Sequence, residues 1–385
     1  MSYYNNYFYQ TSPTYMGRGA VKQLGIEAQK RGLKKFLIVT DAFIASSFII
    51  EKVKASLDAV GAEYVIYDGC NVDPYDTKVY EAYDLAQKEN VDGLIGVGGG
   101  GPMDAAKSVA ILLDNGGPLN KYYMSYPPKS IIPLFEVATT TGTGSENTCF
   151  SVISDTTTGT KKVPYRDPDL AICDPDFVDS LPPDLTACTG MDAFAHAAET
   201  MTGLIQCSKT DALCGYGIKL LMENLETAVK DGSNKEARDN LMIASNLIGI
   251  GFGVMGCHLG HAIGQCIGAA YHTAHGISCA WPLGATMKYC AKTEANKVKM
   301  VADYMGLKYA DDISDEDIGQ LVCDEIDALM KRINVKPMTD YGITREGLIG
   351  IADIVMADNC WPVIPTPLTK EELEEMLGEI FDMNS

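Results

Sequence analysis

The chain has 385 residues, 46% of them apolar, which is enough for two domains with large cores at about 150 residues per domain. Its net charge of −20 excludes nucleic acid and acidic membrane surfaces as partners, because like charges repel. Residues 1–13 lack the basic and apolar regions of a signal peptide, and no apolar run approaches the length of about eighteen residues of a membrane helix. We therefore expect a cytoplasmic protein.

Strands and helices alternate between residue 34 and about residue 140. Apolar runs rich in β-branched residues indicate strands that are buried on both faces, and the stretches between them have the period of amphipathic helices. This order is typical of a parallel α/β sheet. The predicted strands are 34–41, 62–69, 91–100 and 131–142, and the predicted helices between them are 47–61 and 76–90.

Helical periodicity replaces the strand pattern from about Pro183 onward. The segment 180–185 marks the change, so we predict an α/β domain over 1–182 and an all-helical domain over 183–385. Thr369 and Glu372 form a capping box at the start of the last helix. The predicted helices are 185–201, 208–232, 235–253, 294–307, 315–333, 345–359 and 369–381.

Two loops at strand ends are suited to a dinucleotide. Gly98, Gly99, Gly100 and Gly101 follow a buried strand and precede a helix that we expect to begin near residues 102–103. Such a turn brings backbone N–H groups and a helix N-terminus close to a phosphate, although a plain tight turn also explains four glycines. A second loop, at 138–146, is rich in threonine and follows another strand, so both loops can line one crevice.

Asp41 at the end of the first predicted strand bears on the choice of cofactor. A carboxylate there can accept hydrogen bonds from ribose hydroxyls and would repel a 2′-phosphate, which favours NAD over NADP. The alternative is that Asp41 caps the following helix, and both roles are compatible.

The five histidines all lie between His196 and His275, and four of them fall within eighteen residues. Asp192 and His196 are four apart in a helical segment, so their side chains share one face. Together with His261 and His275 they can form a three-imidazole, one-carboxylate site suited to Fe(II) or Zn(II). The alternative is that these are ordinary core or surface residues.

Twelve cysteines are present without a C-x-x-C pair or a zinc-ribbon spacing. Most lie in apolar segments, which favours free, buried thiols in a reducing compartment. Cys257, Cys266 and Cys279 lie near the histidines, but a buried thiol is favoured over a thiolate metal site for each of them.

Four segments together resemble the iron-dependent, group III alcohol dehydrogenases. They are GGGGPMDAAK at 98–107, TTTGTGSE at 139–146, the segment 173–199 that contains DAFAH, and GHAIGQCIGAAYHTAHG at 260–276. The tail around DNCWPVIPTPLTKEELEEML also resembles the family, so the likeness runs almost end to end. It implies a dehydroquinate-synthase-like architecture with a dinucleotide-binding α/β domain followed by a helical, metal-binding domain.

The resemblance also implies roles for individual residues. The interval of fourteen between His261 and His275 is the family's, so these two, with Asp192 and His196, are the implied metal ligands. The implied catalytic group comprises His261, His275 and the neighbouring His272. The implied cofactor-binding residues are Asp41, Gly98, Gly99, Gly100, Asp104, Thr139, Thr140, Thr143 and Lys162.

Some of these positions remain open in the sequence. Lys162 resembles a family lysine that reaches the cofactor ribose, but it is equally explained as a solvated neighbour of Lys161. Gly101 stands where the family usually has Ser, and Asp73 stands where many members have Asn. Gln265 replaces a histidine near the nicotinamide and cannot relay a proton by changing charge, which leaves the proton path open.

The expected activity is the NAD(H)-linked interconversion of a short alcohol and its aldehyde, with one divalent metal, Fe(II) first and Zn(II) second, polarising the carbonyl oxygen. We expect a C2 to C4 substrate with a second polar or anionic group, such as lactaldehyde, 3-hydroxypropanal, succinic semialdehyde or sulfoacetaldehyde. This follows from the residues expected to face the pocket, which together are more polar than the lining of a simple alkyl pocket. They are Asn147, Phe150, Ser151, His258, Gln265 and His272.

The resemblance further implies a homo-oligomer, a dimer or larger. Two rival functions remain at this stage. One is a glycerol-dehydrogenase-like polyol oxidoreductase on the same fold, and the more distant one is a non-enzymatic metal-binding protein, which would not need two glycine-rich loops.

Overall fold

The computed structural model describes residues 12–205 and 207–385, so most of the segment used to judge a signal peptide lies outside it. Contacts within the chain divide it into two compact units, Gln10–Ser180 and Leu181–Ser385. The first is an α/β unit and the second, in its described part, contains helices and no strand, which confirms the predicted combination of α/β and all-α folds.

The first unit is built on a six-stranded sheet in which every pair of neighbouring strands is parallel. The four predicted strands are present and adjacent. Two outer strands were not predicted, because runs of three or four residues are too short to show a period. In sheet order the strands are β1 (Thr14–Met16), β8 (Leu170–Cys173), β5 (Leu134–Ala138), β4 (Gly93–Gly98), β2 (Lys35–Val39) and β3 (Glu63–Tyr67).

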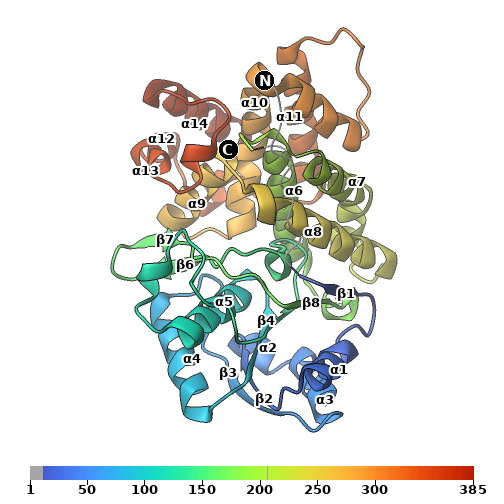
Figure 1. The fold of residues 1–385 in the computed structure, drawn as a ribbon. Helices are drawn as coiled ribbons and strands as arrows, with labels where there is room; N and C mark the ends of the chain where they lie inside the picture. Colours follow the sequence, from blue (N-terminus) through green and yellow to red (C-terminus); the bar gives the residue numbers. More distant parts are fainter. Residues whose placement is uncertain (1–11, 206) are drawn as a thin grey trace. The chain divides into compact units, whose positions relative to one another are not determined.

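Helices cover both faces of this sheet, as Figure 1 shows for α1 (Lys22–Arg31) with α3 (Phe48–Asp58) and for α4 (Asp76–Glu89) with α5 (Gly100–Asn115). Alternate side chains of β2 point to opposite faces of the sheet. Phe36 packs in the core under α1 and α3, and Leu37 packs in the core under α4 and α5. Because both faces are buried, the strands are continuous apolar runs.

Two local features differ from the sequence prediction. Helix α5 begins at Gly100, two residues earlier than expected, so the last glycines of the turn already belong to its first turn. An antiparallel hairpin, β6 (Ile153–Asp155) with β7 (Thr160–Lys162), was not predicted. Its turn contains Gly159 at a φ of 67°, a left-handed conformation that glycine adopts without steric cost.

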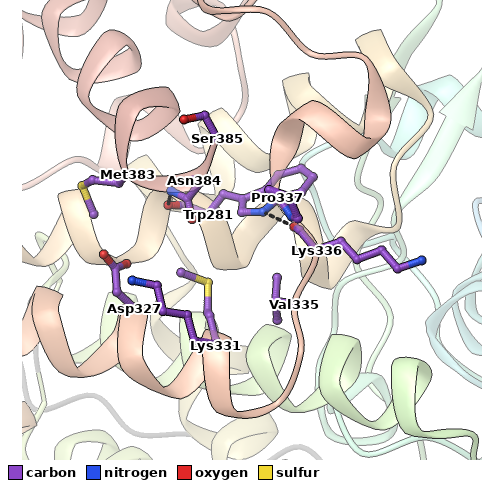
Figure 2. Close-up of a pocket in the computed structure, with 10 residues that line it drawn as sticks. Trp281, Asp327, Lys331, Val335, Lys336, Pro337, Met383, Asn384 and Ser385 are labelled. Carbon is purple, nitrogen blue, oxygen red and sulfur yellow. Dashed lines mark hydrogen bonds between the residues drawn. The ribbon is translucent and has the colours of Figure 1, made fainter.

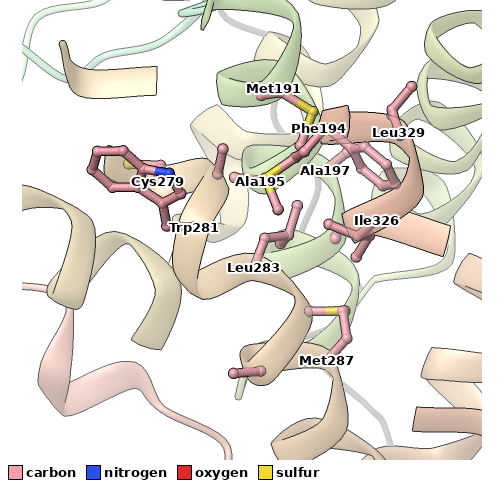
Figure 3. Close-up of a cluster of buried hydrophobic side chains, with 14 of the residues drawn as sticks. Met191, Phe194, Ala195, Ala197, Cys279, Trp281, Leu283, Met287, Ile326 and Leu329 are labelled. Atoms are coloured by element: carbon pink, nitrogen blue, oxygen red, sulfur yellow. The ribbon is translucent and has the colours of Figure 1, made fainter. Parts of the chain in front are cut away.

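The second unit packs around α6 (Pro183–Thr202), which is buried from Thr186 to its last residue. Helix α6 packs against α10 (His275–Tyr304), which in turn packs against α11 (Asp315–Arg332), and Figure 3 shows one side chain of each helix, Phe194, Leu283 and Ile326, in the same buried cluster. The other helices are α7 (Ser208–Lys230), α8 (Lys235–Met255), α9 (Leu259–Tyr271), α12 (Arg345–Ile349), α13 (Ala352–Met356) and α14 (Lys370–Asn384).

Three details bear on the predicted helices. The predicted helix at 294–307 is the second part of α10, which has a kink with non-helical dihedral angles at Glu294. The predicted helix at 345–359 is divided into α12 and α13. The predicted capping box is confirmed, with Thr369 accepting from the Glu372 backbone and the Glu372 side chain accepting in return.

Within the two described ranges, no single helix is both long and apolar enough to cross a membrane. One bent pair, α8 with α9, passes that test by length and composition alone.

Candidate functional site

Helix α6 positions Asp192 and His196 on one buried face. Asp192 Oδ2 lies 4.0 Å from His196 Nδ1, as expected for residues one helical turn apart. The two residues are 3% and 5% exposed, so a charge here is removed from solvent. An isolated buried carboxylate is costly, which indicates that a positive partner belongs to this site.

Helices α9 and α10 bring two more imidazoles to Asp192. Its Oδ1 lies 3.8 Å from His261 Nε2 and 3.5 Å from His275 Nε2. His275 is the first residue of α10, and Gly276 follows it against α6. A Cβ at Gly276 would lie 2.1 Å from the carbonyl oxygen of Cys188, so glycine is what lets α10 approach α6 this closely.

The fourth predicted ligand, His196, lies against the same group. Its ring stacks on that of His261 with a centroid separation of 4.4 Å, and Phe252 stacks on it at 4.2 Å. The structure therefore brings all four predicted ligands into one cluster, in which Asp192, His196 and His261 are buried and His275 is partly exposed. That they bind a metal stays a prediction.

Several donor atoms of this cluster are buried without a hydrogen-bond partner. Among residues 12–205 and 207–385, this holds for Asp192 Oδ1, His196 Nδ1 and His261 Nε2. A buried polar atom that makes no hydrogen bond costs about 1–3 kcal/mol. A carboxylate oxygen and two imidazole nitrogens are the donors that Fe(II) and Zn(II) accept, so these residues fit the implied divalent ion.

A cysteine completes a compact donor group that the sequence reasoning did not select. The ligand atoms of Asp192, His261, His275 and Cys279 all lie within 4.8 Å of one another. The Sγ of Cys279 is 3.8 Å from both ring nitrogens of His275.

Glu199 lies beneath the cluster and was also missed. Its Oε2 accepts from the backbone N–H groups of His258 and His261 at 2.7 and 3.2 Å, and its Oε1 lies 2.7 Å from His261 Nδ1. Although burial raises the pKa of Glu199, His261 and His258 lower it more, to about 2. The spacing carried a signal, because residues 192, 196 and 199 follow the i, i+4, i+7 pattern of one helical face.

The histidines have shifted pKa values for different reasons. Burial lowers the pKa of His196 to about 4, although the negative charge of Asp192 acts to raise it. Burial also lowers the pKa of His258. Burial lowers the pKa of His261 too, but Cys279 and Glu199 raise it further, so the net direction is upward. His196 and His258 are therefore neutral near pH 7, as a metal-binding imidazole must be.

Three of the residues expected to face a substrate pocket, Asn147, Ser151 and His258, are buried in the structure. His258 is 1% exposed, and its Nε2 is 3.0 Å from Thr202 Oγ1, so it is an interior residue. Ser151 is completely buried, and its hydroxyl donates to the backbone carbonyl of Asp104. The sequence shows polarity but not burial, so whether these residues line a substrate pocket stays a prediction.

Two residues tied to proton transfer, Gln265 and His272, lie in the middle of α9 and at its C-terminal end. His272 is exposed and caps α9 in a left-handed conformation with a φ of 55°. Gln265 donates to the Sγ of Cys360 at 3.4 Å, which holds its amide beside the segment that follows α13.

The two predicted nucleotide loops lie side by side at the carboxyl ends of β4 and β5. The Thr139 N–H donates to the Gly98 carbonyl at 2.9 Å. A Cβ at Gly99 would lie 3.3 Å from Thr140, and one at Gly100 would lie 3.1 Å from Thr143. The glycines thus let the two loops lie close together, and residues 98–100 have no side chain to keep a phosphate group away from their backbone N–H groups.

Gly101, where the family usually has serine, is explained by its surroundings. A Cβ at this position would lie 2.4 Å from the backbone oxygens of both Asn71 and Val72. The backbone of residues 71–72 therefore occupies the space that a side chain would need.

Asp41 caps α2 (Ala42–Ala45), because its Oδ1 accepts from the Ile44 N–H at 2.9 Å. The capping role is thus confirmed, and the ribose role stays a prediction. Lys162 ends β7, and its neighbour Lys161 pairs with Asp73 at 2.8 Å.

Asp104 takes part in a buried polar network under the glycine turn. Its carboxylate accepts from Ser145 Oγ at 2.6 Å and from the Val152 N–H at 3.0 Å. Lys107, which the sequence reasoning did not select, is fully buried and donates to the Ser145 and Phe150 carbonyls, both at 2.8 Å. Burial raises the pKa of Asp104, although the positive charge of Lys107 acts to lower it. The network fixes the second loop against α5.

A separate pocket lies near the C-terminus between α10, α11 and α14 (Figure 2). Trp281 donates from Nε1 to the Lys336 carbonyl at 3.1 Å across it, and Asn384 donates to the Trp281 carbonyl at 3.2 Å. None of the residues that line it is a predicted site residue, so it does not bear on catalysis.

Family models match both units of the chain. Residues 11–175 match the model described as iron-containing alcohol dehydrogenase, and residues 186–381 match the model of the C-terminal part of the Fe-containing alcohol dehydrogenase family.

Individual proteins are similar over most of the chain. The NAD-dependent methanol dehydrogenase of Bacillus methanolicus is 36% identical, covering 78% of this chain and 80% of its own length. The sulfoacetaldehyde reductase of Bilophila wadsworthia is 34% identical, covering 89% of this chain and 90% of its own. A crystal structure of a 1,3-propanediol oxidoreductase has a TM-score of 0.93 at 28% identity, covering 98% of this chain and 100% of its own.

Proposed function

The chain belongs to the iron-containing alcohol dehydrogenase family and is an oxidoreductase, and we propose that it interconverts a short-chain aldehyde and its alcohol with NAD(H) and one divalent metal. Fe(II) is the first candidate for the metal and Zn(II) the second. Family membership rules out the non-enzymatic metal-binding alternative. The matches do not favour the glycerol-dehydrogenase-like alternative.

The donor cluster is the observation that carries the proposal. Asp192, His196, His261 and His275 come from three helices, and three of them present buried donor atoms with no hydrogen-bond partner in the described part of the chain. When bound there, the metal supplies a Lewis acid that polarises the carbonyl oxygen of the aldehyde.

The surrounding residues set the chemical state of these ligands. Glu199 accepts the Nδ1 proton of His261, so Nε2, which lies near Asp192, is the nitrogen that would bind the metal once its own proton is lost. Such an outer hydrogen bond fixes the tautomer and the orientation of a ligand imidazole. Burial lowers the pKa of His196 to about 4, so near pH 7 protons do not compete with a metal ion for its imidazole.

The cofactor is assigned to the first unit, within the proposed dinucleotide-binding domain 1–182, and the metal to the proposed helical domain 183–385. We assign the pyrophosphate to Gly98, Gly99 and Gly100 at the N-terminus of α5, where backbone N–H groups and the helix dipole favour anions. The ribose is assigned to Asp41, which favours NAD. The other proposed cofactor residues are Asp104, Thr139, Thr140, Thr143 and Lys162.

Proton transfer is assigned to the exposed imidazole of His272 together with the ligands His261 and His275. Gln265 occupies the position where many members of the family have a histidine that could transfer a proton. The amide of Gln265 does not change charge near neutral pH. His272 is solvent-exposed, so it can exchange protons directly with water.

The proposed substrate is a C2 to C4 aldehyde with a second polar or anionic group. Relatives named for sulfoacetaldehyde and for 1,3-propanediol support this class, whereas the one named for methanol supports a plain small alcohol. Values of kcat/KM with NADH should therefore be measured for lactaldehyde, 3-hydroxypropanal, succinic semialdehyde and sulfoacetaldehyde against butanal. A preference for butanal would rule out the polar substrate class and leave the reductase assignment intact.

Two simpler measurements test the rest of the proposal. NADH fluorescence titration of the metal-loaded protein should show binding, and its absence would end the dehydrogenase assignment. We also propose a cytoplasmic homo-oligomer, a dimer or larger. All twelve cysteines lie in the described residues and none of them forms a disulfide, which fits a reducing compartment. Light scattering on the purified protein tests the oligomeric state.

A further inference from the structure

We propose that Cys279 is a further, sulfur ligand of the divalent metal assigned to Asp192, His196, His261 and His275, an inference that rests on the proposed metal-dependent function. Cys279 lies four residues after His275 on α10, so the two side chains share a helical face. Its side chain is completely buried, and its Sγ belongs to the donor group whose atoms all lie within 4.8 Å of one another.

The separations between donor atoms suit a metal coordinated by nitrogen, oxygen and sulfur. Bonds of about 2.0–2.2 Å to N or O and about 2.3 Å to S place tetrahedral donors roughly 3.3–3.6 Å apart. The measured separations are 3.5 Å from Asp192 Oδ1 to His275 Nε2, 3.8 Å from Asp192 Oδ1 to His261 Nε2 and 3.8 Å from His275 Nε2 to Cys279 Sγ. The nitrogen and oxygen separations are within a few tenths of an ångström of this range. The Cys279 Sγ is equally far, 3.8 Å, from both ring nitrogens of His275, so a turn of one of these two side chains is needed for Nε2 and Sγ to face the same ion.

The packing of α9 against α10 places the sulfur on the ligand side. A Cβ at Gly264, three residues after His261 on α9, would lie 2.7 Å from the Cys279 Sγ. Glycine at this position therefore leaves room for the thiol beside the turn that carries His261.

Cys279 also differs from the other cysteines in its neighbours. All twelve are described, and within the described ranges only Cys279 belongs to a group of three or more histidine, cysteine or acidic donors that could hold an ion. An inert core thiol would be surrounded by apolar groups alone. This thiol belongs to the apolar core, as Figure 3 shows, and also lies within 4.8 Å of donor atoms of two imidazoles and a carboxylate.

Sulfur coordination would change which metals the site prefers. The thiol loses its proton to the solvent when the metal–sulfur bond forms, so metal uptake by the wild-type protein releases one proton more than uptake by a variant without the thiol. Thiolate ligands favour Zn(II), Co(II) and Fe(II) over the oxygen-seeking Mn(II) and Mg(II).

Titration of the full-length, metal-free protein with Co(II) under anaerobic conditions tests the proposal. Co(II) shows visible d–d absorption in any such site, and it shows a near-ultraviolet charge-transfer band only with a thiolate ligand. The wild type is expected to show both, and Cys279→Ser is expected to keep the visible bands and lose the near-ultraviolet band. Cys290→Ser is the matched control, because Cys290 is also completely buried on α10 but lies eleven residues further on, about 16 Å along the helix.

The outcomes separate this inference from the function on which it rests. Cobalt uptake by the wild type without a near-ultraviolet band overturns the sulfur ligand and leaves the metal site intact, and this holds even if Cys279→Ser does not fold. A band that persists in a folded Cys279→Ser or Cys279→Ala protein overturns it equally. Failure of the wild type to take up cobalt, or uptake that His261→Ala leaves unchanged, contradicts the proposed metal site itself.

Discussion

Replacing Glu199 with Gln is expected to weaken metal binding while leaving the fold in place. The Glu199 carboxylate divides its hydrogen bonds: Oε2 accepts from two backbone N–H groups, and Oε1 accepts from His261 Nδ1. In Glu199→Gln the carbonyl oxygen can still accept from the backbone. The amide NH₂ then faces Nδ1, which must give up its proton and become an acceptor.

The change in tautomer carries the expected effect. A neutral imidazole that accepts at Nδ1 carries its proton at Nε2, and Nε2 is the atom of His261 that lies 3.8 Å from Asp192. A protonated Nε2 cannot bind a metal, so binding must first reverse the tautomer against the new hydrogen bond. Loss of such an outer partner weakens metal binding about 10- to 100-fold, or about 1.4–2.7 kcal/mol.

Competition with a chromophoric chelator on the metal-free protein measures this effect directly as a Kd for Zn(II). Glu223→Gln is the control, because Glu223 is an exposed carboxylate on α7, and its Kd should equal that of the wild type. NADH titration checks that the first unit is intact. A Glu199→Gln protein that is folded and binds Zn(II) within twofold of the wild type would refute the assigned role of Glu199.

Three other substitutions have expected outcomes. Burial raises the pKa of Glu136 in the folded protein. The contribution of Glu136 to stability is therefore complete below its pKa in the unfolded chain. It is lost at about 1.4 kcal/mol per pH unit as the pH rises toward its pKa in the folded protein. Glu136→Gln should remove that loss, as urea unfolding of both proteins from pH 4.5 to 8 will show. Gly276→Ala should cost about 1–3 kcal/mol and weaken Zn(II) binding, because its Cβ would meet the Cys188 carbonyl oxygen at 2.1 Å. Gly101→Ser should cost a similar amount and weaken NADH binding in a fluorescence titration, because the backbone oxygen of Val72 lies 2.4 Å from the added Cβ.

Each of these three substitutions has a result that would count against it. For Glu136→Gln, the free energies of the two proteins must diverge with pH, and a constant difference would mean that Glu136 is ionised in the folded protein. For Gly276→Ala and Gly101→Ser, the controls are Gly306→Ala and Gly32→Ala, where a Cβ would meet no atom within 4 Å. Both controls have positive φ and lose stability from the backbone alone, so unchanged Zn(II) and NADH affinities are expected of them.

Regular patterns within short stretches of sequence were enough to predict much of this protein. The four inner strands alternate with helices, the Asp192–His196 pair lies on one helical turn, and the Thr369 capping box forms as expected. These features depend on residues within one helical turn or one strand, so periodicity and capping chemistry reveal them. The resemblance to a family then selected His261 and His275 among the crowded histidines.

Other features were decided only by packing between distant segments. Glu199 forms a hydrogen bond with His261, which is 62 residues away in the sequence. Lys107 donates to the Phe150 carbonyl, 43 residues away. The short strand β8 also left no period in the sequence. Each depends on how whole helices and strands pack, which local sequence does not encode.

The same division applies to the metal site. The spacing of Asp192, His196, His261 and His275 in the chain indicated a metal. The close approach of α9 and α10, through Gly264 and Gly276, brought a thiol that the sequence favoured as an ordinary core residue to the same group of donors. Residue types therefore determined that this protein has imidazole and carboxylate donors, whereas tertiary packing decided that a sulfur atom lies among them.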